Sequence, residues 1–258
     1  MNPFQTSTSR WFYCRLPRRQ PRVRLFGFPP AGGAPVQYFA WPEHLPEEIE
    51  LHVAQLPGRE RRRHEPPLTD INHLLDELTS AVAVLADRSV ALFGHSMGAL
   101  LAFEVARRLR ATDRATPCHL FVAGRRAPHV PFPYDPIHRL PDAEFMRLLQ
   151  DRYGALPEAV RTNPELVEFF LPVIRADMTL LETYQYRPEP QLDCPITVYG
   201  GHADPSTTLR DLEAWAEQTR AGFRLRMFAG DHFFPQSHRL PLLKDISGCL
   251  TGVGAHSV

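Results

Sequence analysis

The 258-residue chain has no surplus of charge of either sign. Lys and Arg together number 29, Asp and Glu also number 29, and the formal net charge at pH 7 is zero. Lysine is almost missing, because Lys244 is the only one and the other basic residues are arginines. A balanced chain lacks the basic excess that attracts polyanions, so we expect no nucleic-acid partner.

Cysteine is scarce, and its spacing argues against two classes of site. The four cysteines contain no Cys-x-x-Cys pair and lie far apart in the chain, at Cys14, Cys118, Cys194 and Cys249. This pattern favours reduced thiols of a cytoplasmic protein over a disulfide framework or a zinc site, and we expect no metal. Long apolar runs are also missing. No stretch of about 18 apolar residues predicts a membrane span, and no apolar segment near the N-terminus predicts a secretory signal.

What the chain does contain is enough apolar sequence, 43%, for a large core in one domain over residues 1–258. Short apolar or alternating runs predict strands at 22–28, 49–55, 90–93, 118–123, 195–199 and 223–228. Helical periodicity predicts helices at 37–44, 69–86, 211–220 and 241–250, with Asp70 or Thr69 as the cap of the second. Alternating strands and helices predict a mostly parallel central sheet flanked by helices. Residues 1–21 are polar and predict a surface arm.

The strand rhythm stops over residues 131–190. Helical stretches begin near Pro141 and at Glu165, and Pro172 is expected to interrupt or kink the second one. We interpret this segment as a helical lid inserted between two strands, whose apolar side chains could line an acyl channel. The alternative is an insertion that packs only on the core.

The stretch with the strongest chemical signal is Gly94-His-Ser96-Met-Gly98. It follows an apolar run and leads directly into an amphipathic helix, as in the strand–turn–helix of a nucleophile elbow. From composition alone, roughly 0.03 Gly-x-Ser-x-Gly matches are expected by chance. The alternative, a glycine-rich turn without catalytic function, is therefore the weaker interpretation, and Ser96 is the predicted nucleophile of an α/β-hydrolase fold.

A serine hydroxyl needs a base, and the base needs an orienting carboxylate. In α/β-hydrolases these follow the serine in the order acid, then histidine. Asp204 follows the strand 195–199 and His232 follows the strand 223–228, which places both at the same sheet edge as Ser96. The amides of Met97 and of Ala31, in the loop Pro29–Ala34, are the predicted oxyanion donors.

The other histidines are weaker candidates for the general base. His95 adjoins Ser96 and is expected to be aimed away from its hydroxyl, while His202 precedes Asp204 and breaks the order. The remaining candidates are expected to be surface residues, and these are His64, His73, His138 and His238. Asp231 adjoins His232 and cannot easily face its ring.

Several motifs together resemble the type II thioesterases of polyketide and nonribosomal peptide assembly. They are Phe28-Pro-Pro-Ala-Gly-Gly33, Gln55-Leu-Pro-Gly-Arg-Glu60, Phe93-Gly-His-Ser-Met-Gly98, Arg139-Leu-Pro-Asp142, Arg175-Ala-Asp177, Tyr199-Gly-Gly-His-Ala-Asp204 and Gly230-Asp-His-Phe-Phe234. In that family Ser96, Asp204 and His232 would match the triad, and Ala31 and Met97 the oxyanion donors. Pro30 stands where relatives often carry another residue. The resemblance implies hydrolysis of acyl groups from the phosphopantetheine arm of an acyl or peptidyl carrier protein, without a cofactor.

Other assignments stay open on the sequence. The same machinery would serve a medium-chain fatty acyl-carrier thioesterase or a general small-ester serine hydrolase. A non-catalytic carrier-binding protein is a third possibility, against which the complete triad argues. A chain-terminating, cyclising thioesterase fits less well, because little sequence precedes the first strand. We expect a monomer. Arginines that could dock an acidic carrier, or be ordinary surface residues, are Arg18, Arg19, Arg59, Arg125 and Arg126.

Overall fold

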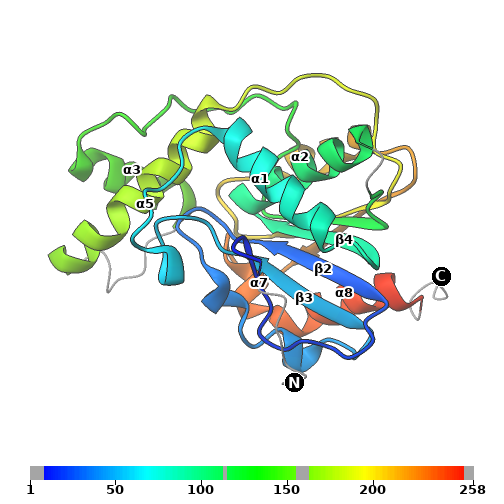
Figure 1. Cartoon of the computed structure of the whole chain (residues 1–258). Helices are drawn as coiled ribbons and strands as arrows, with labels where there is room; N and C mark the ends of the chain where they lie inside the picture. Colours follow the sequence, from blue (N-terminus) through cyan, green and yellow to red (C-terminus); the bar gives the residue numbers. More distant parts are fainter. Residues whose placement is uncertain (1–8, 113–114, 155–162, 253–258) are drawn as a thin grey trace.

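One seven-stranded sheet runs through the molecule (Figure 1). The computed structural model describes residues 9–112, 115–154 and 163–252. Its strands are β1 (Phe12–Tyr13), β2 (Val23–Phe28), β3 (Ile49–Ala54), β4 (Ser89–His95), β5 (His119–Ala123), β6 (Ile196–Gly201) and β7 (Phe223–Phe228). They lie in the order β1-β3-β2-β4-β5-β6-β7. All neighbours pair in parallel except β1, which is antiparallel to β3. The predicted mostly parallel sheet is confirmed.

Helices cover both faces of this sheet. In Figure 1, α1 (Ile71–Val84) and α2 (Met97–Ala111) lie on one face, and α8 (Arg239–Thr251) lies on the other. The β4 side chains alternate between two apolar clusters, with Leu92 packed in the cluster of α1 and α2 and Phe93 in the cluster of α8. This two-sided burial explains why β4 reads as an almost continuous apolar run.

The remaining helices are short or belong to the insertion. They are the 3-10 helices η1 (Pro35–Tyr38), η2 (Pro42–His44), η3 (Glu60–Arg62) and η4 (Ala214–Gln218), and the α-helices α3 (Asp142–Tyr153), α5 (Pro164–Thr183), α6 (Leu209–Glu213) and α7 (Phe234–Ser237). The single helix predicted over 37–44 is wrong: η1 and η2 are separate turns, because Pro42 has no amide with which to continue a helix. In the described part of the chain, no helix has the length and apolar character needed to span a bilayer.

The N-terminal segment is not the surface arm that its polarity predicts. Trp11 and Phe12 are buried, and Phe12 packs edge-on against Phe26 with 5.0 Å between ring centroids. The two-residue strand β1 pairs with the outer edge of β3. A strand of two residues carries no periodicity in the sequence, so only the tertiary contact reveals it.

The insertion between β5 and β6 has an apolar cluster of its own, and Leu180 of α5 also packs in the cluster of α1 and α2. Its helices α3 and α5 lie beyond one end of the sheet (Figure 1) and share an apolar cluster. The members of that cluster are Ile137, Phe145, Leu149, Tyr153, Leu171, Ile174 and Met178. Helix α5 is continuous from Pro164 to Thr183, so Pro172 does not interrupt it, while the kink that was the other expectation stays a prediction. Burial of Leu171 and Ile174 on either side of the proline offsets the hydrogen bond that it removes.

Candidate active site

Ser96 occupies a strained turn between β4 and α2. Its backbone angles are φ 54° and ψ −112°, which a serine adopts at a cost of roughly 1–3 kcal/mol. A Cβ placed on Gly94 would lie 2.1 Å from the Gly98 carbonyl oxygen, and one on Gly98 would lie 1.8 Å from the Phe28 carbonyl oxygen. Only glycine fits at either position, so the predicted strand–turn–helix geometry around Ser96 is confirmed.

The same turn leaves a backbone donor beside the hydroxyl. Met97 is the first residue of α2, and the first amides of a helix have no intrahelical acceptor. The Ser96 amide is itself held by the Ala123 carbonyl at 2.8 Å. The helix N-terminus therefore presents the Met97 amide, together with the positive end of the helix dipole, close to Ser96.

Asp204 and His232 meet at the carboxyl ends of β6 and β7. The Nδ1 of His232 lies 2.9 Å from Oδ2 of Asp204, and both residues are buried. Because an ionised carboxylate only accepts hydrogen bonds, Nδ1 carries the proton and Nε2 is left as the basic nitrogen. The structure thus brings together the acid and the histidine that the sequence pairs.

Ser206 is a member of this network that sequence reasoning missed. Its hydroxyl donates to Asp204 Oδ1 at 2.6 Å, its amide donates to the same oxygen at 2.9 Å, and its Oγ lies 3.0 Å from His232 Nδ1. Burial acts to raise the pKa of Asp204, but the hydrogen bonds and charge of His232 and the bonds from Ser206 outweigh it and lower that pKa. A serine two residues after the acid was the only signal in the sequence.

Ser96 and His232 share a narrow cavity. Both line a space of about 40 Å³, whose other walls come from the Pro30–Ala31 loop, from Phe233, and from the insertion through Leu149, Tyr153, Ile174, Met178 and Leu181. Among the described residues, no hydrogen bond joins the Ser96 hydroxyl to His232. Such bonds often shorten only when substrate arrives. The cavity has room for a short acyl group.

His95 has a structural role here. Its Nε2 donates to the backbone carbonyl of His232 at 2.8 Å. Burial, followed by the neighbouring charge of His232, lowers the pKa of His95 to about 3, so its ring stays neutral. It therefore supports the His232 backbone, which agrees with the expectation that it does not serve as the base.

The other histidines mostly lie where the sequence predicts. His64 and His73 are exposed, His202 is exposed beside Asp204, and His238 is half-buried. The surface position predicted for His138 is wrong. Its Nδ1 lies 2.6 Å from the buried Glu182 carboxylate, which also accepts from the Ile137 and His138 amides. That bond ties the start of the insertion to α5.

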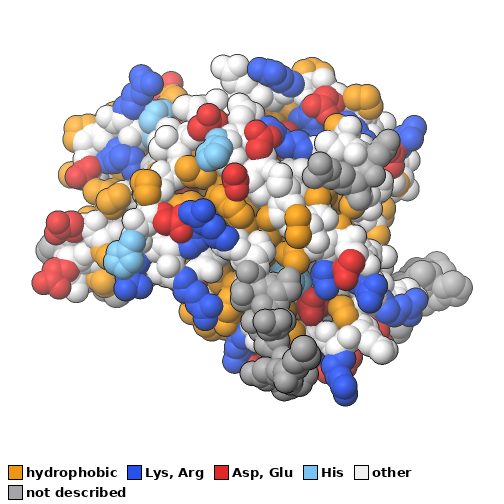
Figure 2. Space-filling view, in the orientation of Figure 1, with side chains coloured by type: hydrophobic (Ala, Val, Ile, Leu, Met, Phe, Trp, Pro, Cys, Tyr) orange, Lys and Arg blue, Asp and Glu red, His pale blue; other side chains and the backbone are white. Residues whose placement is uncertain are grey.

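Only part of the predicted docking set is available to a carrier protein. Arg19 is exposed, whereas Arg18 donates to the carbonyls of Pro42 and Leu45. Arg59 is buried in an ion pair with Asp177, and Arg126 is buried against the Pro131 and Ser206 carbonyls. Arg125 is half-buried, and burial lowers its pKa. The face in Figure 2 intersperses basic and acidic side chains without a field of one sign.

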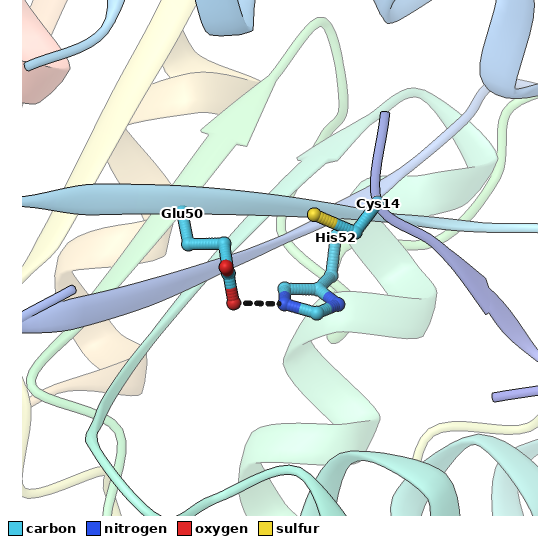
Figure 3. Close-up of side chains that lie close together, drawn as sticks. All are labelled: Cys14, Glu50 and His52. Atoms are coloured by element: carbon cyan, nitrogen blue, oxygen red, sulfur yellow. Dashed lines mark hydrogen bonds and ion pairs between the residues drawn. The ribbon is translucent and has the colours of Figure 1, made fainter. Parts of the chain in front are cut away.

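A second cluster of polar side chains lies at β3, apart from the cavity. The Cys14 sulfur, a Glu50 carboxylate oxygen and a His52 ring nitrogen, which are atoms able to bind a metal, all lie within 4.8 Å of one another (Figure 3). The Glu50 oxygens are already bonded, to His52 Nε2 at 2.7 Å, Arg24 Nε at 3.1 Å and the Arg18 amide at 2.8 Å. Burial and Glu50 raise the pKa of the Cys14 thiol to about 12, which disfavours the thiolate that a metal binds. The donor set favours an ion-pair network over a metal centre.

Comparison with known proteins places this geometry in context. The profile of the family described as "Thioesterase domain" matches residues 23–249. Linear gramicidin dehydrogenase LgrE from Brevibacillus parabrevis is 42% identical over 97% of this chain and 96% of its own length. Gramicidin S biosynthesis protein GrsT from Aneurinibacillus migulanus is 39% identical over 90% of each chain. The structure of the type II thioesterase BorB from the borrelidin biosynthetic cluster is 38% identical, with a TM-score of 0.86, over 95% of this chain and 99% of that one.

Proposed function

The chain belongs to the thioesterase family, and we propose that it hydrolyses acyl thioesters from the phosphopantetheine arm of carrier proteins in polyketide or nonribosomal peptide biosynthesis. In this type II role it clears misprimed or stalled acyl groups. The relatives named for gramicidin S and borrelidin biosynthesis support the pathway class. The observation that carries the chemistry is the strained Ser96 turn, which shares one cavity with a His232 oriented by Asp204.

In the proposed first step, Ser96 becomes acylated. Its Oγ attacks the thioester carbonyl carbon while His232 Nε2 takes the hydroxyl proton. The Met97 and Ala31 amides stabilise the negative oxygen of the tetrahedral intermediate. The intermediate then breaks its C–S bond, and the pantetheine sulfur leaves with the proton from His232. Asp204 stabilises the imidazolium throughout, and its lowered pKa keeps it ionised at neutral pH.

In the second step, water removes the acyl group. His232 Nε2 takes a proton from water, the hydroxide equivalent attacks the ester carbonyl, and the C–O bond to Ser96 breaks as His232 returns the proton to Oγ. The protein side chains supply every proton transfer in this cycle, so the proposal needs no cofactor. We propose that residues 131–190 act as a lid over this site within a single α/β-hydrolase domain covering 1–258. We place the monomeric enzyme in the cytoplasm with the carriers that it serves.

The name of one relative, a dehydrogenase, raises a second activity to test. A dinucleotide-binding fold carries Gly-x-Gly-x-x-Gly between its first strand and helix. The loop after β2 here reads Pro29-Pro-Ala-Gly-Gly-Ala34, and the whole sequence contains no Gly-x-Gly-x-x-Gly. Hydrolysis is therefore favoured over nicotinamide-dependent reduction.

Single-turnover hydrolysis of a short acyl group tests the proposal, with the group carried on a holo carrier protein or on N-acetylcysteamine. We expect faster release from the carrier and a fall of roughly 10⁴–10⁶-fold in the single-turnover rate constant for Ser96→Ala. NADPH consumption in the same mixtures should stay at background. Equal release from both thioesters would support a general ester hydrolase. The same assay with longer acyl groups on the carrier tests the medium-chain alternative, which predicts faster release of the longer chains. Near-normal turnover by Ser96→Ala would contradict the mechanism.

A further inference from the structure

Asp177, on helix α5 of the insertion, holds the loop that carries Ala31. Its Oδ2 accepts from the Gly32 amide at 2.7 Å and from Arg59 Nη1 at 2.8 Å, while Oδ1 accepts from Arg59 Nη2 at 2.8 Å. The same Arg59 Nη1 donates to the Gly33 carbonyl at 3.1 Å. The ion pair therefore forms hydrogen bonds with the two residues that follow Ala31, accepting from the Gly32 amide and donating to the Gly33 carbonyl.

The pair is fully enclosed, which makes a purely stabilising role a poor explanation. Asp177 is 1% exposed and Arg59 is 7% exposed. Desolvation of two charges offsets most of their attraction, and well-packed apolar residues often stabilise a fold as well or better. What apolar residues could not supply is directional bonding to the Gly32 amide and the Gly33 carbonyl.

The loop and α5 also touch through apolar atoms. Gly32 has φ +70°, and a Cβ there would lie 2.9 Å from Cγ1 of Ile174, three residues before Asp177 on the same helix. Ile174, Met178 and Leu181 of α5 line the cavity that contains Ser96. One helix thus forms a wall for the acyl group and holds the oxyanion loop.

We propose that Arg59 and Asp177 are positioning residues, which set the Ala31 amide against the developing oxyanion only while α5 is docked on the loop. The inference rests on the proposed function, because it assigns the loop a role in thioester cleavage. Displacement of reacting groups by about 1 Å can cost on the order of 100-fold in rate. An acyl group that is large enough to displace α5 is therefore expected to lower kcat more than it raises KM. In this way the helix makes kcat depend on the size of the acyl group.

Asp177→Asn and Arg59→Lys test the proposal, with Glu104→Gln as the matched control. Glu104 is also buried in an ion pair, with Arg107 at 2.7 Å, but it contacts α2 and Tyr184 and not the loop. We expect kcat on a short acyl carrier to fall about 10–100-fold in Asp177→Asn with KM within about threefold. Arg59→Lys, which keeps the charge and loses the two-pronged geometry, should give a smaller loss in kcat.

A second readout separates positioning from folding and from the proposed function. The rate at which a fluorophosphonate labels Ser96 should fall in parallel with kcat, because its phosphoryl oxygen needs the same amides. Thermal unfolding and the pH at which activity falls on the acid side should match those of Glu104→Gln. Labelling within twofold of wild type in folded Asp177→Asn, or an equal loss in Glu104→Gln, would overturn the proposal. Wild-type enzyme that labels rapidly but does not cleave carrier thioesters would contradict only the proposed function.

Discussion

The two sides of the cavity are held in different ways. On the sheet side, residues close in the sequence provide many of the contacts: glycines two residues on either side of Ser96 allow its turn, and Ser206 donates two hydrogen bonds to Asp204. On the insertion side, contacts between distant parts of the chain do the work, as in the pair of Arg59 with Asp177, 118 residues apart. We therefore expect proton transfer and the Met97 amide to depend on the sheet side, and the Ala31 amide and the size of the pocket to depend on how the insertion docks.

The largest effect on stability and activity is expected from Gly98→Ala, on the sheet side of the cavity. Gly98→Ala would force a Cβ to within 1.8 Å of the Phe28 carbonyl oxygen, so β2 and α2 must separate. We expect a loss of roughly 3 kcal/mol or more in unfolding free energy and loss of activity. Urea titration measures the change in unfolding free energy. Gly222→Ala is the control, because a Cβ there would approach nothing closer than 3.9 Å, and equal behaviour of the two variants would contradict the close-packed turn.

Acid should weaken the sheet side through His119 on β5. Burial, followed by the charge of Arg224, lowers its pKa from 6.5 to about 4, so the unfolded chain binds the proton first. Its stabilising contribution is full above pH 6.5 and is lost as the pH falls toward 4, at up to about 1.4 kcal/mol per pH unit.

The His119→Gln variant isolates this contribution. Between pH 6.5 and 4, the unfolding free energy of the variant should fall less steeply than that of wild type, as denaturant titrations at several pH values would show. The remaining slope includes His95, whose pKa is also lowered by burial. Parallel curves for wild type and variant would show that His119 does not titrate abnormally.

A smaller effect, on kcat, is expected from Ser206→Ala beside Asp204 and His232. Ser206→Ala removes a hydroxyl bonded to both Asp204 and His232, and we expect a fall of about tenfold in kcat, equivalent to roughly 1.4 kcal/mol. The reason is that Asp204 keeps its bond to His232 but loses a charge-assisted partner. KM should hardly change. Ser89→Ala, at the exposed start of β4, should match wild type, and a Ser206→Ala variant with unchanged kcat would remove Ser206 from the network.

The last comparison concerns two buried tyrosines, and the smallest expected effect is that of Tyr153→Phe. The Tyr199 hydroxyl on β6 donates to Asp245 at 2.8 Å, whereas the Tyr153 hydroxyl on α3 has no hydrogen-bond partner among the described residues. Tyr199→Phe should cost about 1–2 kcal/mol in unfolding free energy, and Tyr153→Phe should cost nothing or stabilise by up to about 1 kcal/mol. Thermal denaturation of both variants measures the difference. A clear loss in Tyr153→Phe would mean that the insertion holds this hydroxyl as tightly as the sheet holds that of Tyr199.

The same division explains what the sequence could predict. The strands, the elbow and the order of Ser96, Asp204 and His232 follow from periodicity and from local turn chemistry, so the sequence identifies them within a few residues. The burial of Arg59 could not be predicted, because a run of arginines usually marks a solvated surface and Asp177 lies far along the chain. Strand β1 was not predicted, because a strand of two residues leaves no periodicity in the sequence. The continuity of α5 through Pro172 depends on packing that only the folded insertion provides.

Trapping the acyl-enzyme tests the central claim most directly. Wild-type enzyme mixed with a short acyl group on a holo carrier would be quenched in acid within one turnover, digested and mapped by mass spectrometry. The account predicts one acylated peptide, containing Ser96, which forms before the free acid appears and is missing in Ser96→Ala. Free acid released without acylation of that peptide, or an acyl group found on another residue, would contradict covalent catalysis by Ser96.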